Sequence, residues 1–455
     1  MISALAVGSM LLAPLTPAFA QSQERGPSLL RDTEIEETLH EEVDPIFVVA
    51  KLDPKRVRIL LVGDPTINAF ATQGLMLGLN TGTILQADTP NEVIGVMAHE
   101  TGHLAGGHPV RSGEMTRAGL KPMLLTMGLG VLAMALGAPD AGAALIGNSG
   151  YFGTLGALTY SREQESRADQ AGVGFLEAAG MSAEGLVTFF DKFRYQEVLD
   201  ESRRYPFFRS HPLSSDRIEA LRAKIEALPH YGVKDSPEAI AKFQIMKAKI
   251  DGFMNPSLSL RKYSDKDPSF PARYARAIAY YQTREPDRAL KMIEVMLTEQ
   301  PNNPYLYELK GQILFEYGRI AEAEAPQRKS VELKPDAALL RINLGQTLTN
   351  LDDKAKRAEG VAELKRALLS EDDNAEAWRL LALAYARDGD EGQAELATAE
   401  QYFVMGALAN SRQFAIRARQ EFPKDSIYWR RATDIILASD PTDEDLRALA
   451  RDGST

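Results

Sequence analysis

The pattern of apolar and polar positions predicts a small sheet near the N-terminus and mainly helices after it. Runs of β-branched and aliphatic residues that predict short strands occupy residues 56–62, 66–71, 75–79 and 83–86. Gly63-Asp64-Pro65 predicts a turn after the first strand, and Asn80-Thr81-Gly82 predicts a hairpin-like turn. Asp32 to Leu39 is consistent with the start of a helix. The expected fold is therefore mainly α with a small β-sheet.

One helix is predicted with clear boundaries, over residues 89–107. Thr89 is a suitable N-cap, Pro90 suits the first helical position, and Glu92 completes a capping box. Residues 93–98 are almost all apolar. This pattern is typical of a helix that is buried on most sides.

The same helix contains a His-Glu-x-x-His pattern at residues 99–103. Positions i and i+4 share one face of a helix, so His99 and His103 can ligate one tetrahedral Zn²⁺. Glu100 would lie beside the metal, where it can act as general base toward a water whose pKa the zinc lowers. The sequence thus predicts a zinc site with Glu100 as a catalytic residue.

A site of this kind needs a third protein ligand from elsewhere in the chain. Glu165 and Asp169 are four residues apart in a predicted helix and share one face. One carboxylate can bind the metal while the other orients a ligand or pairs with a cation. The alternative is a surface charge pair with Arg162 or Arg167.

Composition and charge exclude several classes of function. The chain has 52 lysines and arginines against 63 aspartates and glutamates, a net charge of −11, which argues against sequence-independent nucleic-acid binding. It has no cysteine, which excludes thiol catalysis, disulfides and cysteine-ligated zinc. Any metal site must therefore use histidine and carboxylate.

Residues 1–20 resemble a signal peptide, because a short apolar region precedes the small-residue pattern Ala18-Phe19-Ala20. No lysine or arginine precedes the apolar region, and an uncleaved N-terminal anchor is the alternative. The expectation is export with cleavage after about Ala20.

Two further stretches, 122–139 and 141–161, contain no charged residue, and Asp140 lies between them. Their lengths are compatible with transmembrane helices. However, many glycines lower their average hydrophobicity, and basic residues that would anchor the ends are missing. We expect apolar helices or loops over the active site that touch a membrane surface or an unfolded client.

The C-terminal part repeats with a period of 34 residues. Pro301 and Pro335 are 34 residues apart, and so are Gly311 and Gly345. Residues 374–382 align again after three extra residues. This spacing resembles tetratricopeptide repeats, about four, beginning near Ala272, with a less regular last unit at about 399–423. Stacked helix pairs would form a concave binding surface; an ordinary helical bundle is the alternative.

Several motifs, in this order, resemble the zinc metalloprotease family of HtpX and the CAAX prenyl proteases. They cover roughly residues 40–225 and comprise Asp64–Ala71, Asn80–Gly82, the His-Glu-x-x-His pattern, and Ser161–Asp169. The resemblance implies a gluzincin fold, in which Glu165 is the third zinc ligand and Asp169 the associated aspartate. It also implies that the strand edge at 68–70 and 75–80 holds substrate.

His211-Pro212, followed by Arg217, also resembles an element of this family. His211 could stabilise the oxyanion of the transition state or occupy the open coordination position in a resting state. A His-Pro turn without a catalytic role is a third possibility. His108 is expected to be structural, and His40 and His230 to be surface residues.

These observations predict an α+β gluzincin domain followed by an α-helical repeat solenoid. The expected divisions are a signal peptide at 1–20, a protease domain at 21–235, a linker helix and connection at 236–270 and repeats at 271–455. The combination resembles periplasmic members of the family that act in outer-membrane protein quality control. It implies proteolysis of misfolded or stalled outer-membrane proteins, with the repeats docking on a client or on the barrel-assembly machinery. The alternatives are a chaperone or adaptor with an idle protease site, and proteolysis by an integral membrane protein.

Overall fold

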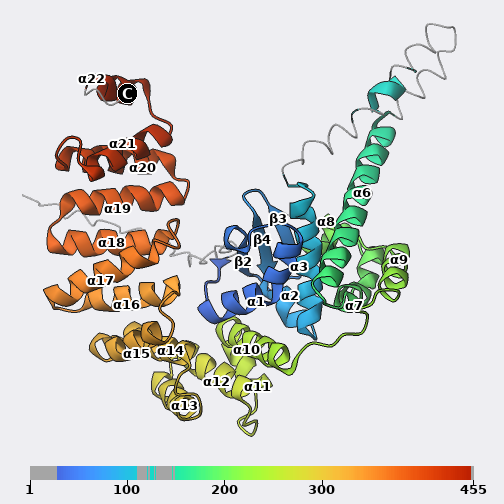
Figure 1. The fold of residues 1–455 in the computed structure, drawn as a ribbon, viewed down its shortest axis with the longest axis horizontal. Helices are drawn as coiled ribbons and strands as arrows, with labels where there is room; N and C mark the ends of the chain where they lie inside the picture. Colours follow the sequence, from blue (N-terminus) through green and yellow to red (C-terminus); the bar gives the residue numbers. More distant parts are fainter. Residues whose placement is uncertain are drawn as a thin grey trace, which may run out of the picture.

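The computed structural model describes residues 28–109 and 149–451, together with 120, 123–127, 129 and 146. The expected signal peptide and most of the apolar stretch between residues 122 and 148 lie outside the described residues. Figure 1 shows a mixed α and β domain beside a stack of helices that contains the C-terminal half of the chain. This arrangement confirms the predicted fold class. None of the described helices is both long and apolar enough to cross a membrane.

The sheet has four strands in the order β1-β2-β4-β3. The strands are β1 Ser28–Leu29, β2 Arg58–Gly63, β3 Ala69–Thr72 and β4 Met76–Asn80. β2 and β4 are parallel, whereas β1 and β3 are antiparallel to their neighbours. β3 therefore forms one edge of the sheet, and it lies next to α3, the helix that carries the histidine pair.

The predicted strand at 83–86 and the hairpin-like turn at Asn80-Thr81-Gly82 are wrong. These residues form the helix α2, Thr81–Gln86, and the hairpin is instead the turn at Gly74 between β3 and β4. Long-range contacts favour the helix: the Thr81 hydroxyl donates to Asp64 O at 2.9 Å and the Thr83 hydroxyl to Asn68 O at 2.8 Å. Tertiary hydrogen bonds thus override the local strand preference.

The remaining helices of this domain pack around the sheet and around α3, Pro90–Ala105. They are α1 Thr33–Val49, α6 Ser149–Ala178, α7 Glu184–Lys192, α8 Pro206–Ser210, α9 Ser215–Ile225, α10 Pro237–Met254 and α11 Pro256–Lys262, with 3₁₀ turns at Pro54–Arg56, Arg194–Val198 and Glu201–Arg203. α3 begins as predicted, since the Thr89 hydroxyl accepts from Glu92 N at 3.3 Å. The Glu92 carboxylate, however, accepts from Asp88 N and not from the cap residue.

α3 lies between the sheet and the helices α6 and α7, and glycines allow a very close approach to α6. A Cβ atom on Gly102 would lie 2.6 Å from Ala168 O, and one on Gly172 would lie 3.0 Å from His99 N. Because backbone meets backbone at these points, the α6 residues near Ala168 come within reach of the histidines on α3.

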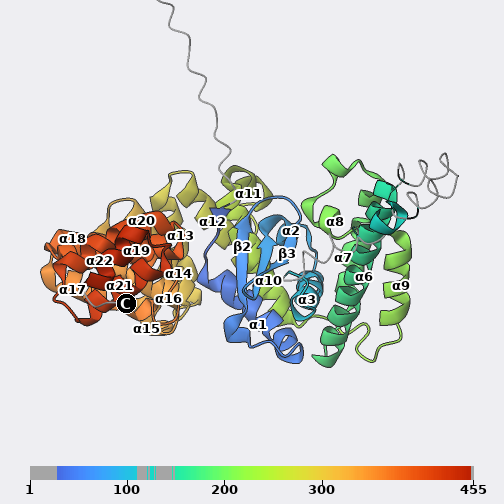
Figure 2. The same ribbon diagram turned by 90° about the horizontal axis from the view of Figure 1, so that it is seen from above.

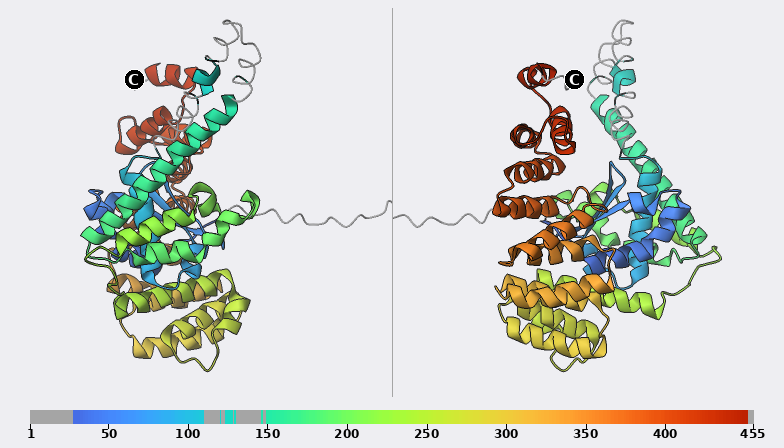
Figure 3. Two further views of the ribbon diagram at one scale, coloured as in Figure 1. Left: turned by 90° about the vertical axis from the view of Figure 1, so that its right-hand side faces the viewer. Right: turned by 60° about the vertical axis from the view of Figure 1, so that its left-hand side comes forward.

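The C-terminal helices form successive pairs, as the 34-residue period predicts. They are α12 Phe270–Gln282, α13 Pro286–Glu299, α14 Pro304–Glu316, α15 Ile320–Leu333, α16 Ala338–Asn350, α17 Lys354–Ala367, α18 Ala375–Asp388, α19 Glu391–Val404, α20 Leu408–Glu421, α21 Ile427–Ala438 and α22 Asp443–Arg451. α14 and α16 start 34 residues apart, and α18 follows after the three extra residues. Five pairs, α12 to α21, occur in the described part of the chain, one more than expected. Figures 1 and 3 show them as a column beside the first domain, and Figure 2 views this column from above.

α10 belongs to the hydrophobic cores of both parts. Its residues Phe243, Met246 and Ile250 are buried in the core of the first domain, whereas Ile245 and Phe253 pack against the core of the first repeats. α10 lies in the segment 236–270, where a linker helix and a connection are expected, and it packs against both parts of the chain.

Candidate metal centre

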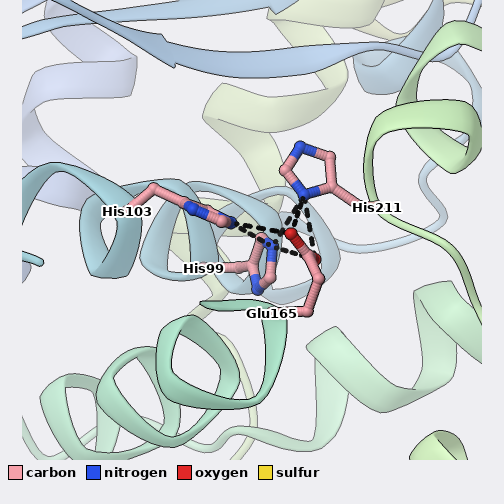
Figure 4. A group of neighbouring side chains, drawn as sticks. All are labelled: His99, His103, Glu165 and His211. Carbon is pink, nitrogen blue, oxygen red and sulfur yellow. Dashed lines mark hydrogen bonds and ion pairs between the residues drawn. The ribbon is translucent and has the colours of Figure 1, made fainter. Parts of the chain in front are cut away.

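Four side chains from three separate helices meet at one point beside α3. They are His99 and His103 from α3, Glu165 from α6 and His211 from the end of α8 (Figure 4). All four are buried, and their ligating atoms lie within 4.8 Å of one another. Within the described residues, this is the only group of three or more histidine, aspartate or glutamate side chains placed so closely.

The spacing of these atoms fits a tetrahedral metal. Ligand atoms that lie about 2.0–2.2 Å from a tetrahedral Zn²⁺ are roughly 3.3–3.6 Å from each other. His99 Nε2 lies 3.2 Å from His103 Nε2 and 3.3 Å from His211 Nδ1. The Glu165 carboxylate lies 3.5 Å from His99 Nε2, 3.4 Å from His103 Nε2 and 3.0 Å from His211 Nδ1. His99, His103 and Glu165 therefore match three corners of one coordination sphere, and His211 lies close to two of these ligands.

Asp169 and Arg217 contact the cluster residues and fix their orientation. His99 Nδ1 lies 2.9 Å from Asp169 Oδ1, so the ring presents its other nitrogen to the cluster. Arg217, on α9, donates to both oxygens of Asp169 and lies 3.3 Å from Glu165. The sequence placed Asp169 in this role by resemblance, but it gave no function to Arg217. The signal available was only its position six residues after His211.

The carboxylates of the cluster stabilise a positive charge on His99, whereas the His103 ring stays neutral. Burial lowers the pKa of His99, but Asp169 and Glu165 outweigh burial and raise it to about 10. Burial and the neighbouring charge of His99 lower the pKa of His103 to about 2. Despite its burial, Glu165 has a pKa well below its ordinary value because His211 and His99 stabilise the carboxylate. A bound cation would supply the positive charge that the Glu165 carboxylate stabilises.

Glu100 lies beside the cluster with its carboxylate unsatisfied. Its side chain is buried, and neither carboxylate oxygen has a hydrogen-bond partner among the described residues. His211 Nε2 lies 3.5 Å from Glu100 Oε1. A buried carboxylate without hydrogen bonds is costly, and such groups concentrate at functional sites. Glu100 is thus free to accept a proton from a molecule that enters the site.

The other histidines have separate roles. His103 Nδ1 lies 2.8 Å from His108 Nδ1, so His108 supports the ring of a cluster residue. The structural role expected for His108 is therefore to hold the His103 ring, which the spacing of the two residues in the sequence does not predict. His40 lies beside Asp44, and His230 beside Glu177, both in partly exposed pairs away from the cluster.

Comparison with known proteins identifies both parts of the chain. Residues 31–225 match peptidase family M48, and residues 274–338 match a tetratricopeptide repeat. The beta-barrel assembly-enhancing protease of Yersinia pestis is 26% identical over 365 residues, which cover 77% of this chain and 72% of that protein. The protein of that name from Escherichia coli is 25% identical over 360 residues, 76% of this chain and 71% of that one.

A third relative resembles the first domain alone. The metalloprotease LoiP of Escherichia coli is 30% identical over 180 residues, which cover 38% of this chain and 64% of that protein. Together with the His-Glu cluster, these matches show that the chain carries a metallopeptidase domain of family M48, followed by tetratricopeptide repeats.

Proposed function

We propose that this protein is a zinc-dependent endopeptidase of the periplasm that hydrolyses misfolded or stalled outer-membrane proteins. The observation that carries the proposal is the unsatisfied Glu100 carboxylate beside the cluster of His99, His103 and Glu165. The names of the relatives from Yersinia pestis and Escherichia coli support a role in the assembly of β-barrel proteins. The signal-like sequence of residues 1–20 supports export.

The donor set supports zinc as the metal, because nitrogen and carboxylate donors at tetrahedral spacing suit Zn²⁺. Held by His99, His103 and Glu165, such a metal would polarise the peptide carbonyl and lower the pKa of an attacking water. Glu100 accepts the proton of that water and then transfers it to the leaving amine. Asp169 and Arg217 hold His99 and Glu165 in place during these steps.

His211 acts in this proposal as a removable block of the fourth coordination position. The distances of its Nδ1 from His99 and from Glu165 are those expected between two ligands of the same metal. This spacing supports the blocking role over transition-state stabilisation. A water needs that position for hydrolysis, so the segment at the end of α8 must move before cleavage. A closed site of this kind also favours the second candidate function, a chaperone or adaptor that seldom cleaves.

The repeats are proposed to bind the client or the barrel-assembly machinery. Their stacked helix pairs and the name of the relatives support this role. No role in nucleic-acid binding is proposed, since the net charge is −11. Contact of the apolar stretch around residues 122–161 with a membrane surface remains a prediction from the sequence.

The test compares the zinc-loaded wild-type chain with Glu100→Gln on an unfolded outer-membrane porin. Glu100→Gln should keep its zinc and its thermal stability but lose nearly all cleavage, because glutamine cannot accept the proton. Glu163→Gln, which changes an exposed carboxylate on α6, should cleave normally. Near-normal cleavage by Glu100→Gln would refute the mechanism. Full rescue of barrel assembly in cells by this variant would favour the chaperone or adaptor function.

A further inference from the structure

A groove of about 780 Å³ lies between the first domain and the inner helices of the repeats. One wall comes from residues 29–32, β2 and β4, and the other from α14, α16 and the start of α18. Two ion pairs join the walls, from Arg31 to Glu371 at 2.9 Å and from Arg58 to Asp373. The column of repeats thus lies beside the domain that carries the sheet (Figure 3), and the two ion pairs connect them.

Negative charge exceeds positive charge at one end of this groove. The buried Lys249 ammonium lies 2.7 Å from Asp32 and 3.0 Å from Glu34, so two carboxylates already share it. Glu308 adds a third carboxylate, and among the described residues it forms no ion pair; its Oε1 accepts from Asn343 Nδ2 at 3.0 Å. Burial and the charge of Asp32 raise the pKa of Glu308 to about 8. The Glu308 carboxyl therefore holds its proton near neutral pH, and a cation bound beside it would favour the ionised carboxylate.

α14 presents a polar stripe along the groove. Glu308, Gln312 and Glu316 are four residues apart, so they share one face of the helix over roughly 12 Å. Glu316 accepts from Gln312 Nε2 at 3.0 Å and from the Tyr281 hydroxyl, but it too forms no ion pair within the described part of the chain. The groove thus offers two carboxylates that lack a cation.

Gln327, on α15, supplies an independent sign of a missing ligand. Its side chain is 1% exposed, it lines the groove, and its Oε1 has no hydrogen-bond partner among the described residues. Its Nε2 donates to Glu308 O at 3.4 Å, which places it beside that residue. A buried acceptor without a donor is costly. A ligand that brings several N–H groups to Glu308 would also donate a hydrogen bond to Gln327 Oε1.

The groove carboxylates are too dispersed to hold a metal ion together, since the only closely spaced group among the described residues is the histidine cluster. The apolar side chains of Leu309, Phe315 and Ile342, with the amides of Asn343 and Gln346, suit an extended peptide. We propose that the groove binds an extended basic segment of a client or partner, with an arginine or lysine side chain between Glu308 and Gln327. This inference depends on the proposed function only for the identity of the protein that supplies the basic segment.

The test measures binding of a fluorescein-labelled heptapeptide of leucine, serine and glycine with one central arginine. Its matched control carries citrulline, a neutral isostere, at that position. Fluorescence anisotropy with the full chain carrying Glu100→Gln, so that no cleavage occurs, should give about tenfold tighter binding of the arginine peptide. Glu308→Gln should remove most of this difference. Glu332→Gln, an exposed carboxylate on α15 outside the groove, should preserve it.

A second variant keeps the test independent of Glu308. Gln346→Lys, on α16 in the same wall as Glu308, should weaken the arginine peptide about tenfold or more by repulsion while leaving thermal unfolding unchanged. Equal affinity for both peptides, or full arginine preference in Glu308→Gln, would overturn the inference. Cleavage of the porin by the wild-type chain is a separate readout. If the groove fails to bind while cleavage persists, the inference alone is refuted; binding without cleavage refutes the protease function alone.

Discussion

The Arg217 guanidinium donates to both carboxylate oxygens of Asp169, each at 2.7 Å. Asp169 in turn lies 2.9 Å from His99 Nδ1, so the orientation of a metal-cluster ring depends on a residue 118 positions away in the sequence. The planar fork of arginine matches a carboxylate in a way that the ammonium of lysine cannot.

Arg217→Lys should therefore lower zinc affinity by about 10- to 100-fold while the domain remains folded. Competition with a chromophoric chelator measures the affinity, and circular dichroism monitors the fold. Arg222→Lys, in the same helix α9 but partly exposed beside Asp191, should bind zinc as the wild type does. Wild-type affinity in Arg217→Lys would show that the contact does not orient His99.

Gly102→Ala should separate α3 from α6. The added Cβ would lie 2.6 Å from the backbone oxygen of Ala168, which cannot move without shifting the helix that carries Glu165. We expect a loss of about 1–3 kcal/mol of stability together with weaker zinc binding. Gly174→Ala is the matched control, because a Cβ at this α6 position meets no atom within 4 Å. If the two variants behave alike in chemical denaturation and zinc titration, the close approach is not needed.

His211→Ala should increase cleavage of an unfolded porin by an amount on the order of tenfold, because it removes the side chain that we propose to block the fourth coordination position. Steady-state rates at saturating zinc measure the effect. His230→Ala removes a histidine from a partly exposed pair with Glu177 and should leave the rate unchanged. Loss of cleavage with zinc retained would instead assign His211 to transition-state stabilisation.

Glu308 should make the stability of the chain depend on pH. Its pKa of about 8 in the folded chain lies above the ordinary value of 4.5, so the folded state binds more protons than the unfolded state between these values. Its contribution to stability is therefore present below about pH 4.5 and is lost as pH rises through about 8. Asp32, Lys249, Glu34 and Glu36 also face this carboxyl, and the pKa values of Glu34 and Glu36 are raised as well.

Glu308→Gln should therefore raise the unfolding temperature by about 2–4 °C at pH 9 but hardly at pH 4. Melting curves from far-ultraviolet circular dichroism provide the measurement. Glu332→Gln, which alters an exposed carboxylate, should show no such difference between the two pH values. An equal effect of Glu308→Gln at both values would contradict the assigned pKa.

Features with local causes could be predicted from the sequence. The cap of α3 depends on neighbours in the chain, and the repeat helices follow a period of 34 residues. The four cluster residues were also foreseen, His99 and His103 from helical spacing and Glu165 and His211 with the help of family motifs. The structure brings these side chains together, and their catalytic roles stay predictions.

Features that depend on distant contacts could not be predicted. α2 is a helix because Thr81 and Thr83 bond to Asp64 and Asn68, which local propensity does not register. The support of His103 by His108 depends on how the chain folds back after α3. The groove beside Glu308 requires the placement of the repeats against the first domain, which no motif in the sequence specifies.

The double burial of α10 has a consequence for how the chain loses its structure. A protease cut near Gly232, before this helix, would remove Phe243, Met246 and Ile250 from one core if the pieces separated. A cut after Met254 would expose Ile245 and Phe253 on the other side. Neither fragment would keep a closed apolar interior, so hydrogen exchange in α10 should report one cooperative opening shared by both halves.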